Sequence, residues 1–303
     1  MISIIISSAK NHLLDAVTRN IDETIGVTYE IISFDNSQGK YGICSVYNKC
    51  SKKAIYEIVC FLHEDIVIRT RNWGRLVIDI FEKNQSLGLL GVAGTSYQPF
   101  IPSGWGHPGL PGKILHYFNL IQHHKFSDKN AKHLYSNPED AQLSKVATLD
   151  GVLLCTTIKV LEQHAFDEDM LQGFHGYDLD FSLSVNLTHS VAVTYNILIE
   201  HFSEGNFEKE WLYESIRLQK KWAAKLPLNL EGLTDKECRV IERRRFKELL
   251  KTLIQFRIPL RILFEALFEG NTSNVITWRL RAKLCYYLFK AWIKGLKKLT
   301  IIT

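Results

Sequence analysis

Short apolar runs alternate with helical stretches over the first 94 residues. The apolar runs are Ile2–Ser7, Thr28–Phe34, Ile58–Leu62 and Leu87–Ala93. Between them lie stretches with apolar residues at helix spacing, such as Asn72–Asn84. This β-α-β-α-β-α-β order is typical of a parallel sheet covered by helices, so it predicts an α/β fold.

Three polar residues, His63, Glu64 and Asp65, directly follow the apolar run Ile58–Leu62. In open α/β sheets, ligands bind outside the carboxyl ends of the strands. The three side chains are therefore placed where a substrate should lie, and carboxylate oxygens there could bind a divalent cation that holds a diphosphate. The alternative is a polar strand end that caps the next helix.

The alternating pattern stops at Thr95–Lys145, which contains five of the seven prolines and five of the eleven histidines. The segment is too long for an ordinary connection and predicts a functional loop, a lid or an insertion. Its histidines lack cysteine partners and i, i+4 spacing, so we interpret them as solvated loop residues. Gly104–Gly112 is rich in turn formers and could form an acceptor-binding flap.

The C-terminal part differs from the rest in charge and pattern. The chain carries a net charge of +5, but residues 239–303 contain 15 Lys and Arg against 4 Asp and Glu, which leaves the preceding residues acidic. Beyond Thr234 the pattern is wholly helical. We expect a catalytic α/β domain at 1–230, with 95–145 as an insertion or flap, and a basic helical extension at 231–303.

The last predicted helix separates apolar from basic residues. Its apolar face consists of Cys285, Phe289, Trp292, Leu296 and Leu299. Its basic face consists of Lys283, Lys290, Lys294 and Lys297. Such a helix packs on the protein body, packs on a second copy in a homo-oligomer, or lies on an anionic membrane. Nucleic acid is not an expected partner, because the aromatic side chains lie away from the lysines.

The six cysteines include no C-x-x-C pair and suggest neither a disulfide framework nor a zinc site. Cys60 and Cys155 lie within apolar runs, as expected of free core thiols. The N-terminus lacks signal-peptide features, and no apolar run approaches the ~20 residues needed to span a bilayer. We therefore expect a cytoplasmic protein, peripheral on the inner face of the cell membrane if the last helix binds lipid.

Four stretches follow the order of a known family. They are the opening strand IIISS, the second strand EIISFDNS, FLHEDI at the D-x-D position, and GFHGYDLDFSL, preceded by FDE, at the acidic catalytic position. They resemble family 2 glycosyltransferases, nucleotide-sugar-dependent enzymes with the GT-A fold, and in particular the bacterial streptomycin-biosynthesis-type glycosyltransferase domain. The resemblance covers Ile2–Phe207 and implies a Rossmann-like, mostly parallel sheet covered by helices, followed here by an all-helical C-terminal extension.

The resemblance implies donor-binding roles at the matching positions. Asp35 matches the carboxylate that receives the nucleotide base, and Asp65 matches the second Asp of D-x-D, which binds the metal. His63 replaces the first Asp and adds no negative charge to a cation site. The donor-binding residues implied are Ser7, Asp35, His63, Glu64, Asp65, Asp150 and Gly151.

The remaining matches concern the metal and the base. His201, in EHFSEGNF, matches a histidine that supplies a further ligand beside Asp65, and imidazole with carboxylate suits Mn²⁺ as well as Mg²⁺. Asp178 matches the general base, although Tyr177 replaces the Glu commonly found before it. Asp178 would accept the proton of the acceptor hydroxyl while the cation stabilises the leaving diphosphate.

These assignments predict an inverting glycosyltransferase of the hexosyltransferase type that uses a nucleotide-diphosphate-sugar donor. The expected acceptor is a hydroxyl of a saccharide or lipid-linked saccharide in bacterial surface polysaccharide biosynthesis. A nucleotidyltransferase would normally carry a Gly-rich, basic loop after the first strand, whereas SSAKNH has one Lys and no Gly. A catalytically inactive nucleotide-sugar-binding protein on the same fold is the third interpretation, because of the departures at His63 and Tyr177.

Overall fold

The computed structural model describes residues 1–123, 130–203, 209–270 and 273–299, with side chains described up to residue 293. The chain divides into two compact units. Unit 1 comprises residues 1–96 and 114–206, and unit 2 comprises residues 97–113 and 207–303.

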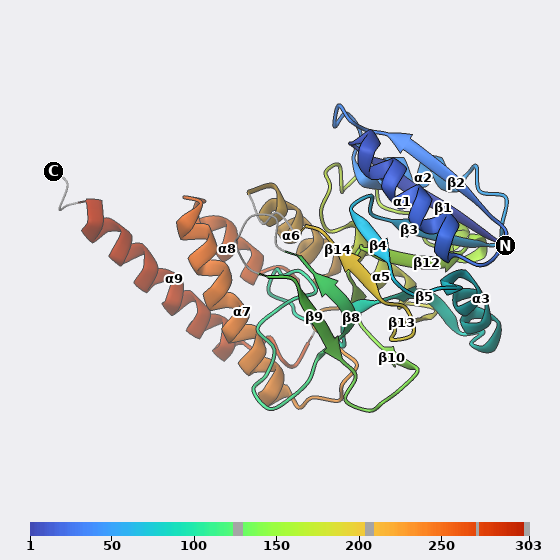
Figure 1. Cartoon of the computed structure of the whole chain (residues 1–303). Coiled ribbons are helices and arrows are strands. Elements are labelled where there is room, and N and C mark those ends of the chain that lie inside the picture. The colour runs from blue at the N-terminus through green and yellow to red at the C-terminus, as the bar shows by residue number, and fades with distance from the viewer. Residues whose placement is uncertain (124–129, 204–208, 271–272, 300–303) are drawn as a thin grey trace. The chain divides into compact units, whose positions relative to one another are not determined.

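The larger sheet of unit 1 contains the predicted alternating strands (Figure 1). Its strand order is β10-β13-β5-β12-β3-β1-β2. Five strands run in one direction: β1 (Ile2–Ser8), β2 (Tyr29–Asp35), β3 (Ile58–Leu62), β5 (Leu87–Gly91) and β13 (Ser190–Thr194). Two run in the opposite direction: β10 (Leu143–Lys145) and β12 (Leu153–Thr157). The prediction of a mostly parallel sheet is therefore confirmed.

Helices cover both faces of this sheet. On one face, α1 (Asn11–Thr24) and α3 (Trp73–Lys83) bury apolar side chains in a core that includes Ile4. On the other face, α2 (Ile43–Ser51) packs in a second core that includes the neighbouring Ile5. The helices α4 (Ile158–Gln163) and α5 (Tyr177–Val185) contribute to this second core. Because successive side chains of a strand point to opposite faces, a continuous apolar run serves both cores.

Unit 1 contains a second sheet, which the chain enters after strands of the first. Its path is β11 (Thr148–Leu149), β6 (Ala93–Thr95), β8 (His116–Gln122), β14 (Ile199–His201) and β4 (Ile66–Ile68), and β9 (Lys132–Ser136) pairs with β8. The chain thus passes from one sheet to the other between β3 and β4. Residues 63–65 form the corner at this crossing, which lets their side chains diverge.

The segment Thr95–Lys145 is more regular than a lid or loop, because it contributes strands to both units. Its histidines are accordingly not all solvated: that interpretation is wrong for His107, whereas His133 is exposed and His123 is half-buried, each with a side-chain partner. His107 is only 8% exposed and lies 2.7 Å from the carbonyl of Tyr97. His133 pairs with Asn119, and His123 with Glu200. His124 lies outside the described residues.

Unit 2 is mainly helical, which confirms the helical C-terminal extension. Its helices are α6 (Lys209–Trp222), α7 (Asp235–Gln255), α8 (Leu260–Leu267) and α9 (Trp278–Leu299). A short pair of strands, β7 (Tyr97–Gln98) and β15 (Leu228–Asn229), joins the 97–113 segment to the C-terminal part. Helix α7 begins with a capping box in which Thr234 and Glu237 satisfy each other's backbone N–H groups.

A buried carboxylate holds the 97–113 segment against α7. Glu242 accepts hydrogen bonds from the Tyr97 hydroxyl at 2.8 Å and from the backbone N–H groups of Phe100 and Ile101, both at 3.0 Å. Burial raises the pKa of Glu242 to about 7 although all three donors favour the ionised form. The segment is therefore a structural part of unit 2.

Helix α9 buries a face other than the predicted apolar one. Leu280, Leu284 and Leu288 are its buried side chains, whereas Phe289 and Trp292 are each 55% exposed. The side chains of the residues from 294 onward lie outside the described part.

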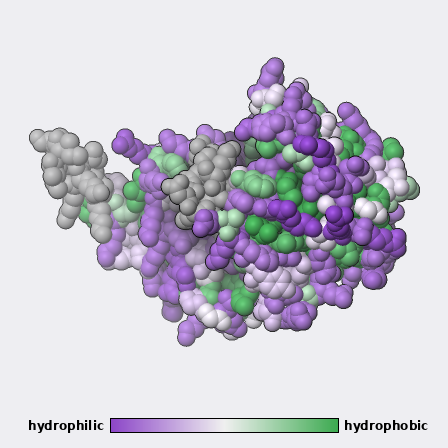
Figure 2. All heavy atoms as spheres, in the orientation of Figure 1, coloured by the Kyte–Doolittle hydropathy of each residue, from purple (hydrophilic) through white to green (hydrophobic). Residues whose placement is uncertain are grey.

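Mostly hydrophilic residues cover the visible surface of α7 in Figure 2. Among the described helices, none is both long enough and apolar enough to cross a membrane. All six cysteines are free, as expected.

Candidate functional site

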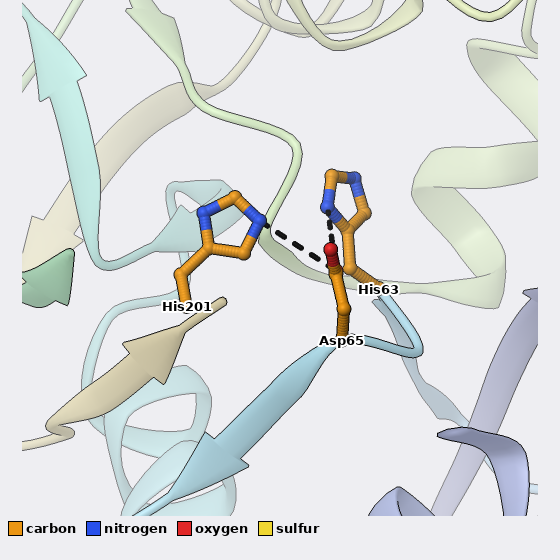
Figure 3. A group of neighbouring side chains, drawn as sticks. All are labelled: His63, Asp65 and His201. Atoms are coloured by element: carbon orange, nitrogen blue, oxygen red, sulfur yellow. Dashed lines mark ion pairs between the residues drawn. The ribbon is translucent and has the colours of Figure 1, made fainter. Parts of the chain in front are cut away.

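Three polar side chains from two segments of unit 1, residues 63–65 and β14, converge on one point (Figure 3). The carboxylate of Asp65 lies between the imidazoles of His63 and His201. Asp65 Oδ1 is 3.6 Å from His201 Nε2 and 3.9 Å from His63 Nδ1. The antiparallel pairing of β14 with β4 produces the arrangement, because its register sets His201 opposite Ile66, the residue after Asp65. The three potential ligand atoms lie within 4.8 Å of one another.

The orientation of His201 indicates that a cation fits this cluster. Gln122 donates from Nε2 to the carbonyls of His123, at 2.7 Å, and Ser203, at 2.9 Å, which turns its amide oxygen toward His201 Nδ1 at 3.4 Å. A proton on Nδ1 leaves the lone pair of Nε2 facing Asp65. His201 Nε2 is buried and has no hydrogen-bond partner. A lone pair aimed at a carboxylate oxygen is the donor arrangement that a divalent cation would satisfy.

His63 is oriented by the residue that replaces the usual Glu of the catalytic motif. His63 Nε2 lies 2.8 Å from the Tyr177 hydroxyl, which in turn lies 3.5 Å from the carbonyl of Gly151. If Nε2 donates to Tyr177, Nδ1 carries a lone pair toward Asp65. Burial lowers the pKa of His63, and nearby His201 lowers it further, so the neutral imidazole that binds metals is favoured. The two departures from the family pattern are thus hydrogen-bonded to each other.

Asp65 is held in its ionised form. Burial alone would raise the pKa of this carboxyl, but the Ser203 hydroxyl and, in their protonated forms, His201 and His63 hold the pKa below its ordinary value. Ser203 donates to Oδ2 at 2.5 Å, which leaves Oδ1 directed at the imidazoles. The cluster therefore offers two imidazole nitrogens and one carboxylate oxygen. That set suits Mn²⁺ and other borderline ions better than Mg²⁺, which prefers oxygen.

Glu64 faces a different part of unit 1. Its Oε2 accepts hydrogen bonds from Ser8 Oγ at 2.7 Å and from the backbone N–H groups of Ala9 and Lys10 at 3.1 and 3.2 Å. These donors form the connection between β1 and α1. Glu64 therefore shapes the loop at the carboxyl end of β1, and its carboxylate is not part of the cluster around Asp65.

Asp178 lies in the first turn of α5, with its carboxylate against the backbone of Gly151. Oδ2 accepts from the N–H of Gly151 at 3.1 Å, and Oδ1 from the N–H of Leu179 at 2.9 Å. Burial raises the pKa of Asp178 to about 7, and the neighbouring Asp150 carboxylate adds to the rise. A side chain larger than Gly does not fit at 151, since a Cβ would lie 2.1 Å from the Tyr177 hydroxyl. Asp150 accepts from the N–H of Val152 at 2.8 Å.

Ser7 and Asp35 lie at the carboxyl ends of neighbouring parallel strands. The register of β1 with β2 pairs Ser8 with Asp35, so both strands end at the same sheet edge as β3. Asp35 is exposed, and the N–H of Ser37 donates to its Oδ1 at 2.9 Å and lowers its pKa. Asp35 is therefore an exposed, ionised acceptor two strands away from β3.

Three residues of this neighbourhood were not predicted to have a role. Ser203 lies two residues after His201, within the same matched stretch, and could have been found there. Gln122 comes from the segment interpreted as a loop, and only the parallel pairing of β8 with β14 sets it opposite His201. Glu200 precedes His201 on β14, so its side chain points to the opposite face of the strand. It pairs with Arg69, and with His123 at 2.5 Å. Glu200 lies in the matched stretch as well, and only Gln122 has no sequence pattern that links it to the site.

The family match and the fold together assign this chain to the glycosyltransferases, with a GT-A type of fold. The model of a glycosyltransferase-like family matches residues 3–224, and the chain belongs to that family. Residues 1–349 of TarS from S. aureus have a similar structure, with a TM-score of 0.58 and 13% identity over 98% of this chain and 88% of that one. The same protein in complex with UDP-GlcNAc gives a TM-score of 0.55, at 12% identity and the same coverage.

More distant is a structure of GalNAc-T7 with UDP, GalNAc and Mn²⁺, at 11% identity and a TM-score of 0.49. The match covers 84% of this chain but only 56% of that one, so the present chain spans little more than half of that protein's length. No curated protein matches the sequence significantly. At these identities the solved structures establish the fold, and the family match establishes the class.

The candidate metal cluster predicts that substitution of any of its three residues weakens the binding of Mn²⁺. We expect His63→Ala, Asp65→Asn and His201→Ala each to lower the affinity for Mn²⁺ by at least about tenfold, because each removes one donor atom. Titration calorimetry of the protein without nucleotide measures this directly. Asp169→Asn, which changes an exposed carboxylate outside the cluster, should bind as the native protein does. Native affinity in all three variants would contradict the assignment.

The raised pKa of Asp178 predicts a pH-dependent gain in stability when its charge is removed. Unfolding returns this pKa from about 7 to its ordinary value of 3.8, so between these values the folded state binds more protons and stability falls as pH rises. Asp178→Asn should therefore raise the free energy of unfolding by about 1–3 kcal/mol at pH 8 and by much less near pH 4. Urea denaturation at both pH values tests this. An equal effect at both pH values would show that the ionised carboxylate is not the cause.

Proposed function

We propose that this protein is an inverting glycosyltransferase that uses a nucleotide-diphosphate-sugar donor and a divalent cation. The observation that carries the proposal is the hydrogen bond between His63 and Tyr177. His63 belongs to the candidate metal cluster, and Tyr177 is the residue before the candidate base, Asp178. This bond links the two groups that such a transfer needs, one to stabilise the leaving group and one to activate the acceptor.

The cation would neutralise charge on the diphosphate as the bond from the sugar to the phosphate breaks. His63, Asp65 and His201 would hold it. The likeness of the fold to TarS, whose structure with UDP-GlcNAc is known, supports a uridine nucleotide sugar as the first donor to test. The residues proposed to contact the donor include Ser7, Asp35, Asp150 and Gly151. For Glu64 we propose a positioning role, through the loop after β1.

Asp178 is proposed to take the proton of the acceptor hydroxyl. A base works best when its pKa lies near the working pH, and the pKa of Asp178 is raised to about 7. The N–H groups of Gly151 and Leu179 fix the direction of its carboxylate. Removal of a proton by Asp178 would make the acceptor oxygen a better nucleophile on the face of the sugar opposite the leaving diphosphate, which inverts the anomeric centre.

Features of unit 2 support the acceptor and the location that we propose. We propose a catalytic domain at 1–230, a helical extension at 231–303, and a saccharide or lipid-linked saccharide as acceptor, in bacterial surface polysaccharide biosynthesis on the cytoplasmic side of the membrane. Phe264, Phe289 and Trp292 support this, because they line an open apolar pocket of about 360 Å³ between α8 and α9. Exposed aromatic side chains beside many Lys and Arg residues are typical of a surface that lies on anionic lipid.

The proposed base predicts a loss of turnover without a loss of donor binding. Asp178→Asn should lower turnover by about 10²–10⁴-fold, since the amide cannot accept the proton. Binding of UDP in the presence of Mn²⁺ should stay near native. Transfer or hydrolysis of a panel of UDP sugars, with Asp169→Asn as the matched control, measures the effect.

Two outcomes would count against this proposal. Undiminished turnover in Asp178→Asn would exclude Asp178 as the base. Metal-dependent binding of UDP without any turnover by the native protein would favour the alternative, a nucleotide-sugar-binding protein that has lost activity through the changes at His63 and Tyr177.

The exposed aromatic face of α9 predicts binding to anionic vesicles. The full chain should sediment with vesicles that contain phosphatidylglycerol and be released by high salt, because Lys and Arg near an anionic surface contribute about 1 kcal/mol each. Phe289→Ser with Trp292→Ser should weaken sedimentation, whereas Tyr213→Ser, an exposed aromatic residue on α6, should not. Equal binding to neutral and anionic vesicles would contradict the role of charge.

A further inference from the structure

A cationic pocket lies between α7 and α9, within unit 2. Its volume is about 620 Å³. Five of its lining side chains are basic: Lys236, Arg239, Arg243, Arg279 and Lys283. None of its lining side chains is acidic. Five like charges around one cavity repel one another, so the pocket is a place where an anion would be strongly stabilised.

The spacing of the five basic residues along α7 and α9 sets them on one face of each helix. Lys236, Arg239 and Arg243 follow an i, i+3, i+7 pattern on one face of α7. Arg279 and Lys283 are an i, i+4 pair in the first two turns of α9. Two helices that pack against each other therefore present their basic faces to the same cavity.

The charges of the pocket are not neutralised within the described part of the chain. None of the five side chains is in an ion pair with a described carboxylate, whereas Arg217, Lys220 and Arg245 of the same unit each have such a partner. The described contacts of the pocket arginines are with backbone carbonyls and one ring. Arg239 donates to the carbonyl of Asn274 at 3.2 Å, and Arg243 donates to that of Arg239 at 3.1 Å.

The start of α9 adds to the positive potential. Trp278 and Arg279 begin the first turn of the helix, which contains no acidic residue. Thr277 precedes this turn and accepts a hydrogen bond from the N–H of Leu280 at 3.2 Å. The partial positive charge of a helix N-terminus favours anions there. Trp278 is 74% exposed, so its ring offers an apolar surface next to the cations.

We propose that this pocket binds a phosphate-bearing anion, such as a diphosphate or a phosphate monoester. Arginine forks match phosphate oxygens two at a time, and the lysines supply further donors. The site lies in unit 2 and needs none of the residues of the proposed transferase site. The phosphate could belong to a soluble compound or to a lipid headgroup, since both present the same oxygens.

The test compares two triple variants that remove equal charge from the same two helices. Arg239→Gln, Arg243→Gln and Lys283→Gln change the pocket. Lys247→Gln, Lys251→Gln and Lys290→Gln, the matched control, change exposed cations of α7 and α9 that do not line it. Inorganic pyrophosphate is titrated at physiological salt with a chelator present, so that binding through a metal in unit 1 does not contribute.

The pocket variant should bind pyrophosphate at least about 100-fold more weakly than the native protein, and the control within about threefold. Sedimentation with vesicles of phosphatidylcholine, with and without phosphatidic acid, then separates the sources. Pocket-dependent binding to phosphatidic acid supports a lipid headgroup, and pyrophosphate binding without vesicle binding supports a soluble anion. Equal losses in both variants, or no pyrophosphate binding by the native protein, would overturn the proposal. UDP binding with Mn²⁺, measured on the same variants, reports separately on unit 1.

Discussion

The antiparallel pairing of β4 with β14 is the constraint on which the candidate site depends. β4 is only three residues long, yet its register sets His201 beside the corner that carries His63 and Asp65. The parallel pairing of β14 with β8 then brings Gln122 to the other ring nitrogen of His201. Two segments far apart in the sequence thus supply one donor set, and a third orients it. A shift of one residue in either pairing would turn these side chains to the opposite face.

Backbone N–H groups donate hydrogen bonds to three carboxylates of the site. Glu64, Asp150 and Asp178 each accept at least one hydrogen bond from a backbone N–H group. Those bonds do not remove the repulsion between Asp150 and Asp178, which together with burial raises the pKa of Asp178. A group that makes the folded state less stable at neutral pH is expected at a functional site, where a proton must be taken up.

Unit 2 contains one buried carboxylate with hydrogen-bond partners and a group of basic side chains at its surface. Glu242 is buried and satisfied by three donors, so it acts as a structural anchor for the 97–113 segment. The basic side chains between α7 and α9 remain at the surface without acidic partners among the described residues. Basic side chains that form no ion pair within the fold are available to bind an anionic ligand. The anchor and the basic pocket both include residues of helix α7.

The sequence by itself determined the α/β class, the direction of most strands and the helical C-terminal part, because hydrophobic periodicity is a local property of the chain. It also singled out His63, Glu64, Asp65, Asp178 and His201 as candidates. It did not determine that the chain changes sheets at residues 63–65, or that β8 and β9 form part of unit 1. It also did not determine that α9 buries Leu284 rather than Phe289. Only the tertiary structure decided that His63 hydrogen-bonds to Tyr177 and that Glu64 accepts from Ser8 and the loop after β1. Strand register and side-chain direction depend on contacts between distant segments, and local patterns carry no information about them.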